Sequence, residues 1–162
     1  MNPEGMNPSS RFLTVLLLAL AVTACSRPTD GYQVISRDSA YTADSSSCYT
    51  FKPDFHDSGA VYETAITARV DIRKMRSNKL SMDISVISPK HHIAVERVEF
   101  PLQYSRKQHI VDMSWSYRRN IHIPEDEAGI WTVCVQVRGQ DASEAVQALG
   151  FSYKTNKTRR DG

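Results

Sequence analysis

The longest regular pattern in this chain is an alternation of apolar and polar side chains from Val61 to Arg73. The even positions carry the larger apolar residues, such as Tyr62, Ile66 and Val70, whereas most odd positions are polar or charged. Successive side chains of a strand point to opposite faces, while a helix would scatter these residues around its axis. The pattern therefore predicts one long strand that is buried on its even side.

Shorter runs with the same period lie on both sides of this strand. We expect further strands over residues 32–36, 47–51, 80–86, 93–102, 111–117 with 121–123, 130–137 and 149–153. The polar turns KMRSNK and SPKHH separate the three central runs, so we expect 61–73, 80–86 and 93–102 to form an antiparallel meander. We also expect a loop over 37–46, a surface loop PEDEAG that turns sharply at Gly129, and one helical turn in DASEAVQ capped by Asp141 or Ser143.

About eight short strands without a sustained helical period predict an all-β domain. An antiparallel β-sandwich, immunoglobulin-like or jelly-roll-like, hides one face of each sheet and exposes the other, as the alternation requires. A closed barrel is the alternative. We place this domain at residues 32–155 and expect the polar end, residues 156–162, to be disordered.

An apolar segment near the N-terminus, VLLLALAVTAC, runs from Val15 to Cys25 after a leader with one basic residue, Arg11. Its last four residues fit the pattern read by bacterial lipoprotein signal peptidases, in which the cysteine is acylated and becomes the new N-terminus. The run is too short for a spanning helix, which needs about twenty apolar residues; an ordinary cleaved signal peptide is the alternative. We therefore expect a signal peptide over 1–24, lipidation of Cys25, and a tether over 25–31 that ends at the domain.

A thioether-linked diacylglycerol together with an amide-linked acyl chain holds a protein on a membrane essentially permanently. The expected partners are thus the membrane, reached through the N-terminal lipid, and other envelope proteins. No acidic residue directly follows Cys25, which favours the outer membrane as location.

The 20 basic and 18 acidic residues are interspersed and leave a net charge of +2, which gives no case for nucleic acid as a partner. Setting Cys25 aside leaves Cys48 and Cys134, which can form one disulfide in an oxidising compartment. Both lie on the polar phase of their expected strands, so they can meet if those strands are neighbours. Two free thiols are the alternative.

We find no pattern for catalysis or for a cofactor. HExxH, CxxC, GxSxG, P-loop and GxGxxG motifs are absent from the sequence, and adjacent His91 and His92 in a turn share no fixed geometry for a metal. The acidic loop 125–127 lacks the spacing of an EF-hand, so a solvated loop is the simpler interpretation. Arg69 and Arg73, expected on the outward phase beside Asp71, are the candidate partner contact; a solvated cross-strand charge ladder is the alternative.

The order of landmarks resembles the gliding-motility-associated lipoproteins of GldH type. The lipoprotein signal is followed by the strand from Tyr62 to Arg69, a strand opened by Leu80 that closes in Ser-Pro-Lys, VEFPL, IHIPEDEAGIWTVCVQV and ALGFSYK. The resemblance covers residues 47–155. This chain departs from the family in QYSRKQHIVDMSW, where a Gly/Trp-rich segment is expected, and in the turn before Leu80, which lacks an aromatic-proline pair.

The resemblance implies a non-enzymatic lipoprotein of the cell envelope, an accessory or structural component associated with gliding motility or with its secretion machinery. The alternative function is a lipid-anchored β-sandwich module that binds a glycan or another extracellular ligand. Glycan binding calls for exposed aromatic residues grouped on one face. Most aromatic residues here, Tyr62, Phe100, Trp115, Tyr117, Trp131, Phe151 and Tyr153, occupy the phase expected to be buried.

Overall fold

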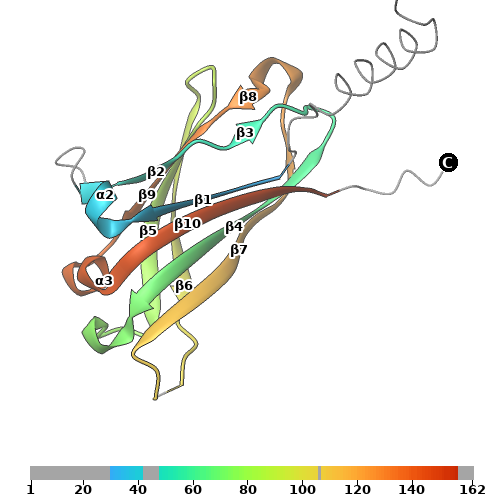
Figure 1. The fold of residues 1–162 in the computed structure, drawn as a ribbon. Coiled ribbons are helices and arrows are strands. Elements are labelled where there is room, and N and C mark those ends of the chain that lie inside the picture. Colours follow the sequence, from blue (N-terminus) through green and yellow to red (C-terminus); the bar gives the residue numbers. More distant parts are fainter. Residues whose placement is uncertain (1–29, 42–47, 106, 157–162) are drawn as a thin grey trace, which may run out of the picture.

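The computed structural model describes residues 30–41, 48–105 and 107–156. The expected signal peptide, Cys25, most of the tether, and residues 157–162 of the expected tail lie outside the described residues. Within them the all-β prediction is confirmed, because two four-stranded antiparallel sheets pack against each other (Figure 1). No helix in this part of the chain has the length and apolar character needed to cross a membrane.

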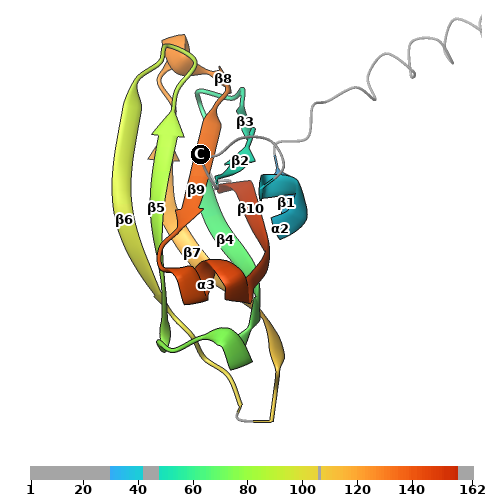
Figure 2. The same ribbon diagram turned by 90° about the vertical axis from the view of Figure 1, so that its left-hand side faces the viewer.

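The two sheets form the two layers of the sandwich, which Figure 2 shows after a turn of 90°. Sheet A contains, in spatial order, β1 (Gly31–Ser36), β10 (Val146–Asn156), β4 (Val61–Asp71) and β7 (Ile110–His122). Sheet B contains β2 (Tyr49–Phe51), β9 (Thr132–Val137), β5 (Lys79–Ile87) and β6 (Ile93–Pro101), and a short ribbon joins β3 (Asp54–Phe55) to β8 (Gly129–Ile130). The helical turns are α2 (Arg37–Tyr41), η1 (Ile72–Lys74), η2 (Glu125–Glu127) and α3 (Gln140–Ala145).

Strands of the first half of the domain pair with strands of the second half in reverse order. The pairs are β1 with β10, β2 with β9, β3 with β8, β4 with β7, and β5 with β6. Partners such as Tyr49 with Val135, or Ile84 with Glu96, are nearly equidistant along the chain from the turn at Lys90. The domain is therefore one long antiparallel hairpin rolled over on itself, and its strand order is that of a jelly roll.

The predicted three-stranded meander is wrong. The β4 strand belongs to sheet A, whereas β5 and β6 form a hairpin in sheet B. The reason lies in η1, because the strand ends at Asp71 and this turn carries the chain from one sheet to the other. Residues Ile72 and Arg73, which continue the alternation in the sequence, do not belong to the strand.

The predicted inward phase of β4 forms the centre of the core. Tyr62, Ile66 and Val70 are buried, as are Leu80, Met82 and Ile84 of β5. Of the seven aromatic residues expected inside, Tyr62, Phe100, Phe151 and Tyr153 are buried, whereas Trp115, Tyr117 and Trp131 are partly buried and pack against the core. The predicted inward faces of these strands are thus confirmed, and the three partly buried rings pack against the core.

The connections differ from the sequence predictions in two places. Residues 37–41 form α2 rather than a loop. The expected helical turn forms as α3, but its N-cap is Gly139 and no side chain caps it. Gly139 has a φ of 89°, a conformation that favours glycine, so the backbone at this residue, and not Asp141 or Ser143, starts the helix.

Candidate interaction site on the outer face of sheet A

Arg69 lies on the outward side of β4, as predicted. Its Nε atom is 3.7 Å from Oδ1 of Asp112 on the neighbouring strand β7, and the two side chains are 55% and 75% exposed. An exposed ion pair of this kind contributes at most about 1 kcal/mol to stability. Both charged groups therefore remain accessible to a partner.

The prediction that Arg73 and Asp71 share this outward face is wrong. Asp71 is 3% exposed, and Nε and Nη2 of Arg73 donate to its two carboxylate oxygens at 2.9 and 2.7 Å. The backbone N–H of Arg73 donates to the same carboxylate at 3.2 Å and so caps η1. These bonds lower the pKa of Asp71 to about 2. The Arg73 side chain is thus paired with Asp71 and does not form a continuous contact surface with Arg69.

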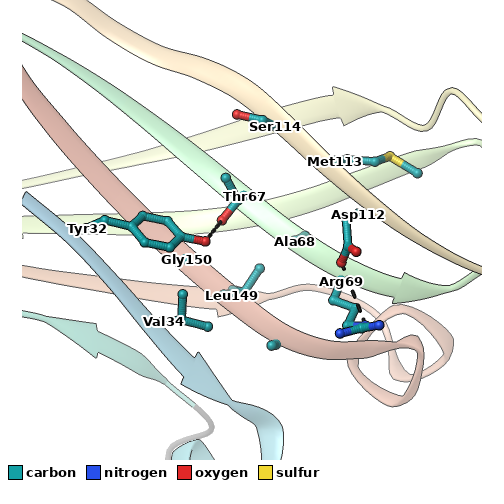
Figure 3. Close-up of a pocket in the computed structure, with 11 residues that line it drawn as sticks. Tyr32, Val34, Thr67, Ala68, Arg69, Asp112, Met113, Ser114, Leu149 and Gly150 are labelled. Atoms are coloured by element: carbon teal, nitrogen blue, oxygen red, sulfur yellow. Dashed lines mark hydrogen bonds and ion pairs between the residues drawn. The ribbon is translucent and has the colours of Figure 1, made fainter.

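An open hollow of about 380 Å³ lies beside Arg69 on the outer face of sheet A (Figure 3). All four strands of the sheet line it. The lining residues are Tyr32 and Val34 from β1, Ala148, Leu149 and Gly150 from β10, Thr67, Ala68 and Arg69 from β4, and Asp112, Met113 and Ser114 from β7. One end of the hollow is charged through Arg69 and Asp112. The opposite end is bounded by Tyr32 and Val34.

Gly150 shapes the floor of this hollow. The Tyr32 ring lies over it, and the Tyr32 hydroxyl is 3.1 Å from Oγ1 of Thr67, two strands away (Figure 3). A Cβ atom at Gly150 would lie 2.9 Å from the Tyr32 hydroxyl oxygen and closer still to Thr67 Oγ1. The glycine therefore allows the bond between Tyr32 and Thr67 to cross β10.

The apolar boundary of the hollow was missed at the level of the sequence. Tyr32 and Val34 are 61% and 55% exposed, although apolar residues at alternate positions usually mark the buried side of a strand. The signal that could have found them is Ile35, which shows that this strand carries apolar residues on both faces. Chemically, the hollow offers an aromatic ring, an aliphatic side chain and two opposite charges on a rigid sheet, the mixture typical of protein interaction surfaces.

Cys48 and Cys134 form a disulfide in the structure, with their Cα atoms 5.8 Å apart. Cys48 directly precedes β2, which pairs with β9, the strand that holds Cys134. β2 and β9 are neighbouring strands, which is the condition under which the sequence predicted this disulfide. Cys25 lies outside the described residues, so its lipidation stays a prediction.

A second polar cluster joins the two sheets where β6 and β7 form their free edges. Arg118 donates to Glu96 Oε1 through Nε at 3.0 Å and Nη2 at 2.6 Å, and the Tyr117 hydroxyl donates to the same oxygen. Burial disfavours the charged carboxylate, but these bonds outweigh it and lower the pKa of Glu96. Burial and the bond to Glu96 raise the pKa of Tyr117.

The acidic loop and the histidine pair lie together at one end of the sandwich. Asp126 of η2 forms an ion pair with Lys90, and Glu127 contacts Nδ1 of His92. These carboxylates are thus engaged by neighbouring basic groups. Among residues 30–41, 48–105 and 107–156 no three His, Cys, Asp or Glu side chains are grouped so that they could hold a metal ion.

Comparisons of this chain with protein-family models, with curated proteins and with solved structures found no match.

Proposed function

We propose that this protein is a non-enzymatic lipoprotein of the cell envelope that docks onto another envelope protein through the hollow face of sheet A. The observation that carries the proposal is the exposure of Tyr32 and Val34 beside the Arg69–Asp112 pair on one rigid sheet face. Burying the exposed parts of the two apolar side chains would contribute roughly 2 kcal/mol. Tyrosine and arginine are also enriched among residues that dominate binding energy.

The sequence supports the cellular setting of this proposal. The segment that ends in Cys25 fits a lipoprotein signal, and the disulfide between Cys48 and Cys134 is typical of proteins outside the reducing cytoplasm. The order of landmarks resembles lipoproteins of GldH type. We therefore propose an accessory or structural role associated with gliding motility or its secretion machinery, at the outer membrane.

The test is site-specific photo-crosslinking in cells that produce the full chain. A photoreactive residue at Ser114, inside the hollow, should crosslink one defined envelope protein, and Arg69→Glu should remove that product. The matched control is a photoreactive residue at Val95, which is also exposed and lies on β6 of sheet B. Equal products from both positions, or none from Ser114, would contradict docking through this face.

Anchoring is tested separately by metabolic labelling with a fatty acid. The native chain should incorporate the label, and Cys25→Ala should abolish it. An unlabelled native chain would remove the lipoprotein part of the proposal and leave the crosslinking result intact.

The alternative, a glycan-binding module, has weaker support in this hollow. Two aromatic rings aligned in a groove would favour it, but among the residues that line the hollow Tyr32 is the one aromatic residue. Loss of the Ser114 crosslink in the presence of an added oligosaccharide would revive this function.

A further inference from the structure

Two loops meet at the end of the sandwich that is farthest from Gly31 and Asn156, the outer ends of β1 and β10. Residue pairing places Val61 of β4 beside Asn156 at one end, and Asp71 beside Ile110 at the opposite end. At that opposite end lie the β4–β5 connection with η1 and the β6–β7 loop (Figure 1). Two backbone hydrogen bonds tie these connections together, from Ile72 N–H to the His109 carbonyl at 2.9 Å and from Leu102 N–H to the Asn78 carbonyl at 2.8 Å.

This end concentrates positive charge. Residues 71–79 and the described residues of 102–110 contain five cations, Arg73, Lys74, Arg76, Lys79 and Lys107, and one acid, Asp71. Asp141 of α3 also lies against this end, at the Arg76 N–H. The net charge including Asp141 is therefore +3, whereas the whole chain carries +2. A nearly neutral protein thus presents a local basic surface.

Three of these cations are open to a ligand. Arg73 is paired with Asp71, and Lys79 with Glu99. Lys74, Arg76 and Lys107 are exposed and form no ion pair with any described residue. We call these three residues the basic end.

The backbone under the basic end is held in place. The Arg76 N–H donates to Oδ2 of Asp141 at 3.2 Å, which fixes the β4–β5 connection to α3. In the other loop the Gln108 N–H donates to the Ser105 carbonyl, and the Ser105 N–H donates to Oε1 of Gln108. A preorganised set of cations loses less conformational entropy when it binds a polyanion.

We infer that the basic end binds an acidic polysaccharide. The disulfide indicates a compartment outside the reducing cytoplasm, where carboxylated, phosphorylated or sulfated glycans are the polyanions whose repeated charges fit cations on two adjoining loops. Tyr104, 41% exposed in the same loop as Lys107, offers a ring face for a sugar. A bilayer fits less well, because Tyr104 and Ile110, each about two-fifths exposed, are the large exposed apolar residues described on these loops.

The experiment measures binding of fluorescent heparin, as a probe polyanion, to the full-length protein in a neutral detergent. Because it needs no membrane anchor, its result is independent of the modification of Cys25 and of the sheet A partner. We expect saturable binding that weakens as salt rises, and no binding of neutral dextran. Each cation near an anionic surface contributes about fivefold, so the triple variant Lys74→Gln, Arg76→Gln, Lys107→Gln should lose about a hundredfold in affinity.

The matched control, Lys52→Gln, Arg119→Gln, Lys154→Gln, removes the same charge from exposed positions elsewhere and should keep most of the affinity. Equal loss in the two variants would show that net charge alone attracts heparin and would overturn the inference. Absence of heparin binding by the native protein would do the same, and so would binding of phosphatidylglycerol vesicles by the chain with Cys25→Ala when heparin does not compete.

Discussion

Removing the disulfide between Cys48 and Cys134 should lower the free energy of unfolding substantially. The bridge joins residues separated by 86 positions, and in the chain-entropy model a loop of that length stabilises the folded state by about 4.6 kcal/mol at 25 °C. Measured values for disulfides are more often about 2–4 kcal/mol. We therefore expect Cys48→Ser with Cys134→Ser to lose between about 2 and 4.6 kcal/mol.

The loss should begin at β2. This strand has three residues, and it buries Tyr49 and Phe51 against the core while pairing with β9 alone in sheet B. The disulfide lies at its start, so without it the backbone of this strand is held to sheet B by its three residue pairs with β9. Amide hydrogen exchange should consequently accelerate at Tyr49 and Phe51 before it does so in β4.

The assay is guanidinium-induced unfolding of the full chain at pH 7, followed by tryptophan fluorescence. Dithiothreitol should shift the midpoint of the native protein to that of the double serine variant and should leave the variant unchanged. Shifts below about 1 kcal/mol in both comparisons would refute the reasoning, because the closed loop would then constrain the unfolded chain very little.

Three further predictions concern single contacts. Asp71 has a pKa of about 2 in the folded protein, held down first by the side chain of Arg73. Its contribution to the free energy of unfolding is therefore present above its unfolded pKa near 3.8 and is lost as the pH falls toward 2. Urea unfolding between pH 5 and pH 2 should show this loss in the native protein and a smaller one in Asp71→Asn. Gly150→Ala should destabilise by about 1–3 kcal/mol through overpacking, and Thr67→Ala should recover part of that loss, because Thr67 Oγ1 is the atom closest to the new Cβ; thermal unfolding of the single and double variants measures both effects. Glu96→Gln should lower the pKa of Tyr117, which burial and then the bond to Glu96 raise; ultraviolet titration against Tyr117→Phe isolates this phenol, and an unchanged titration would assign the shift to burial alone.

The sequence was sufficient to predict the faces of the strands but not the sheets to which they belong. The alternation with a period of two predicts that Tyr62, Ile66 and Val70 lie on the same face of the strand, and all three are buried. The alternation contains no information on whether the next strand pairs with β4 or crosses to the other sheet. That choice depends on η1, where the Asp71 carboxylate caps the turn and ends a strand whose alternation continues in the sequence.

The candidate site was predictable only in part for the same reason. Arg69 is charged and on the outward phase, so its exposure could be expected. Tyr32, Thr67 and Gly150 come from three strands, and the hollow exists because the rolled hairpin places β1 and β4 on either side of β10. The role of Arg73 was not predicted because Asp71 is buried and its carboxylate accepts two hydrogen bonds from the Arg73 guanidinium.

The short distance along the chain between Cys25 and Tyr32 determines which partner each proposed surface can reach. Tyr32 is seven residues from Cys25, and seven fully extended residues span at most about 25 Å. If Cys25 carries lipid, the Tyr32 end of the hollow therefore stays within that distance of the membrane surface, where a partner in the same membrane can contact it. The eleven residues of β4 extend over about 36 Å from the end with Gly31 and Asn156 to the basic end. Lys74, Arg76 and Lys107 therefore lie at the other end of the sandwich. A single domain can then hold a membrane partner near its anchor and a polyanion at its far end, because these contacts use different strands and loops.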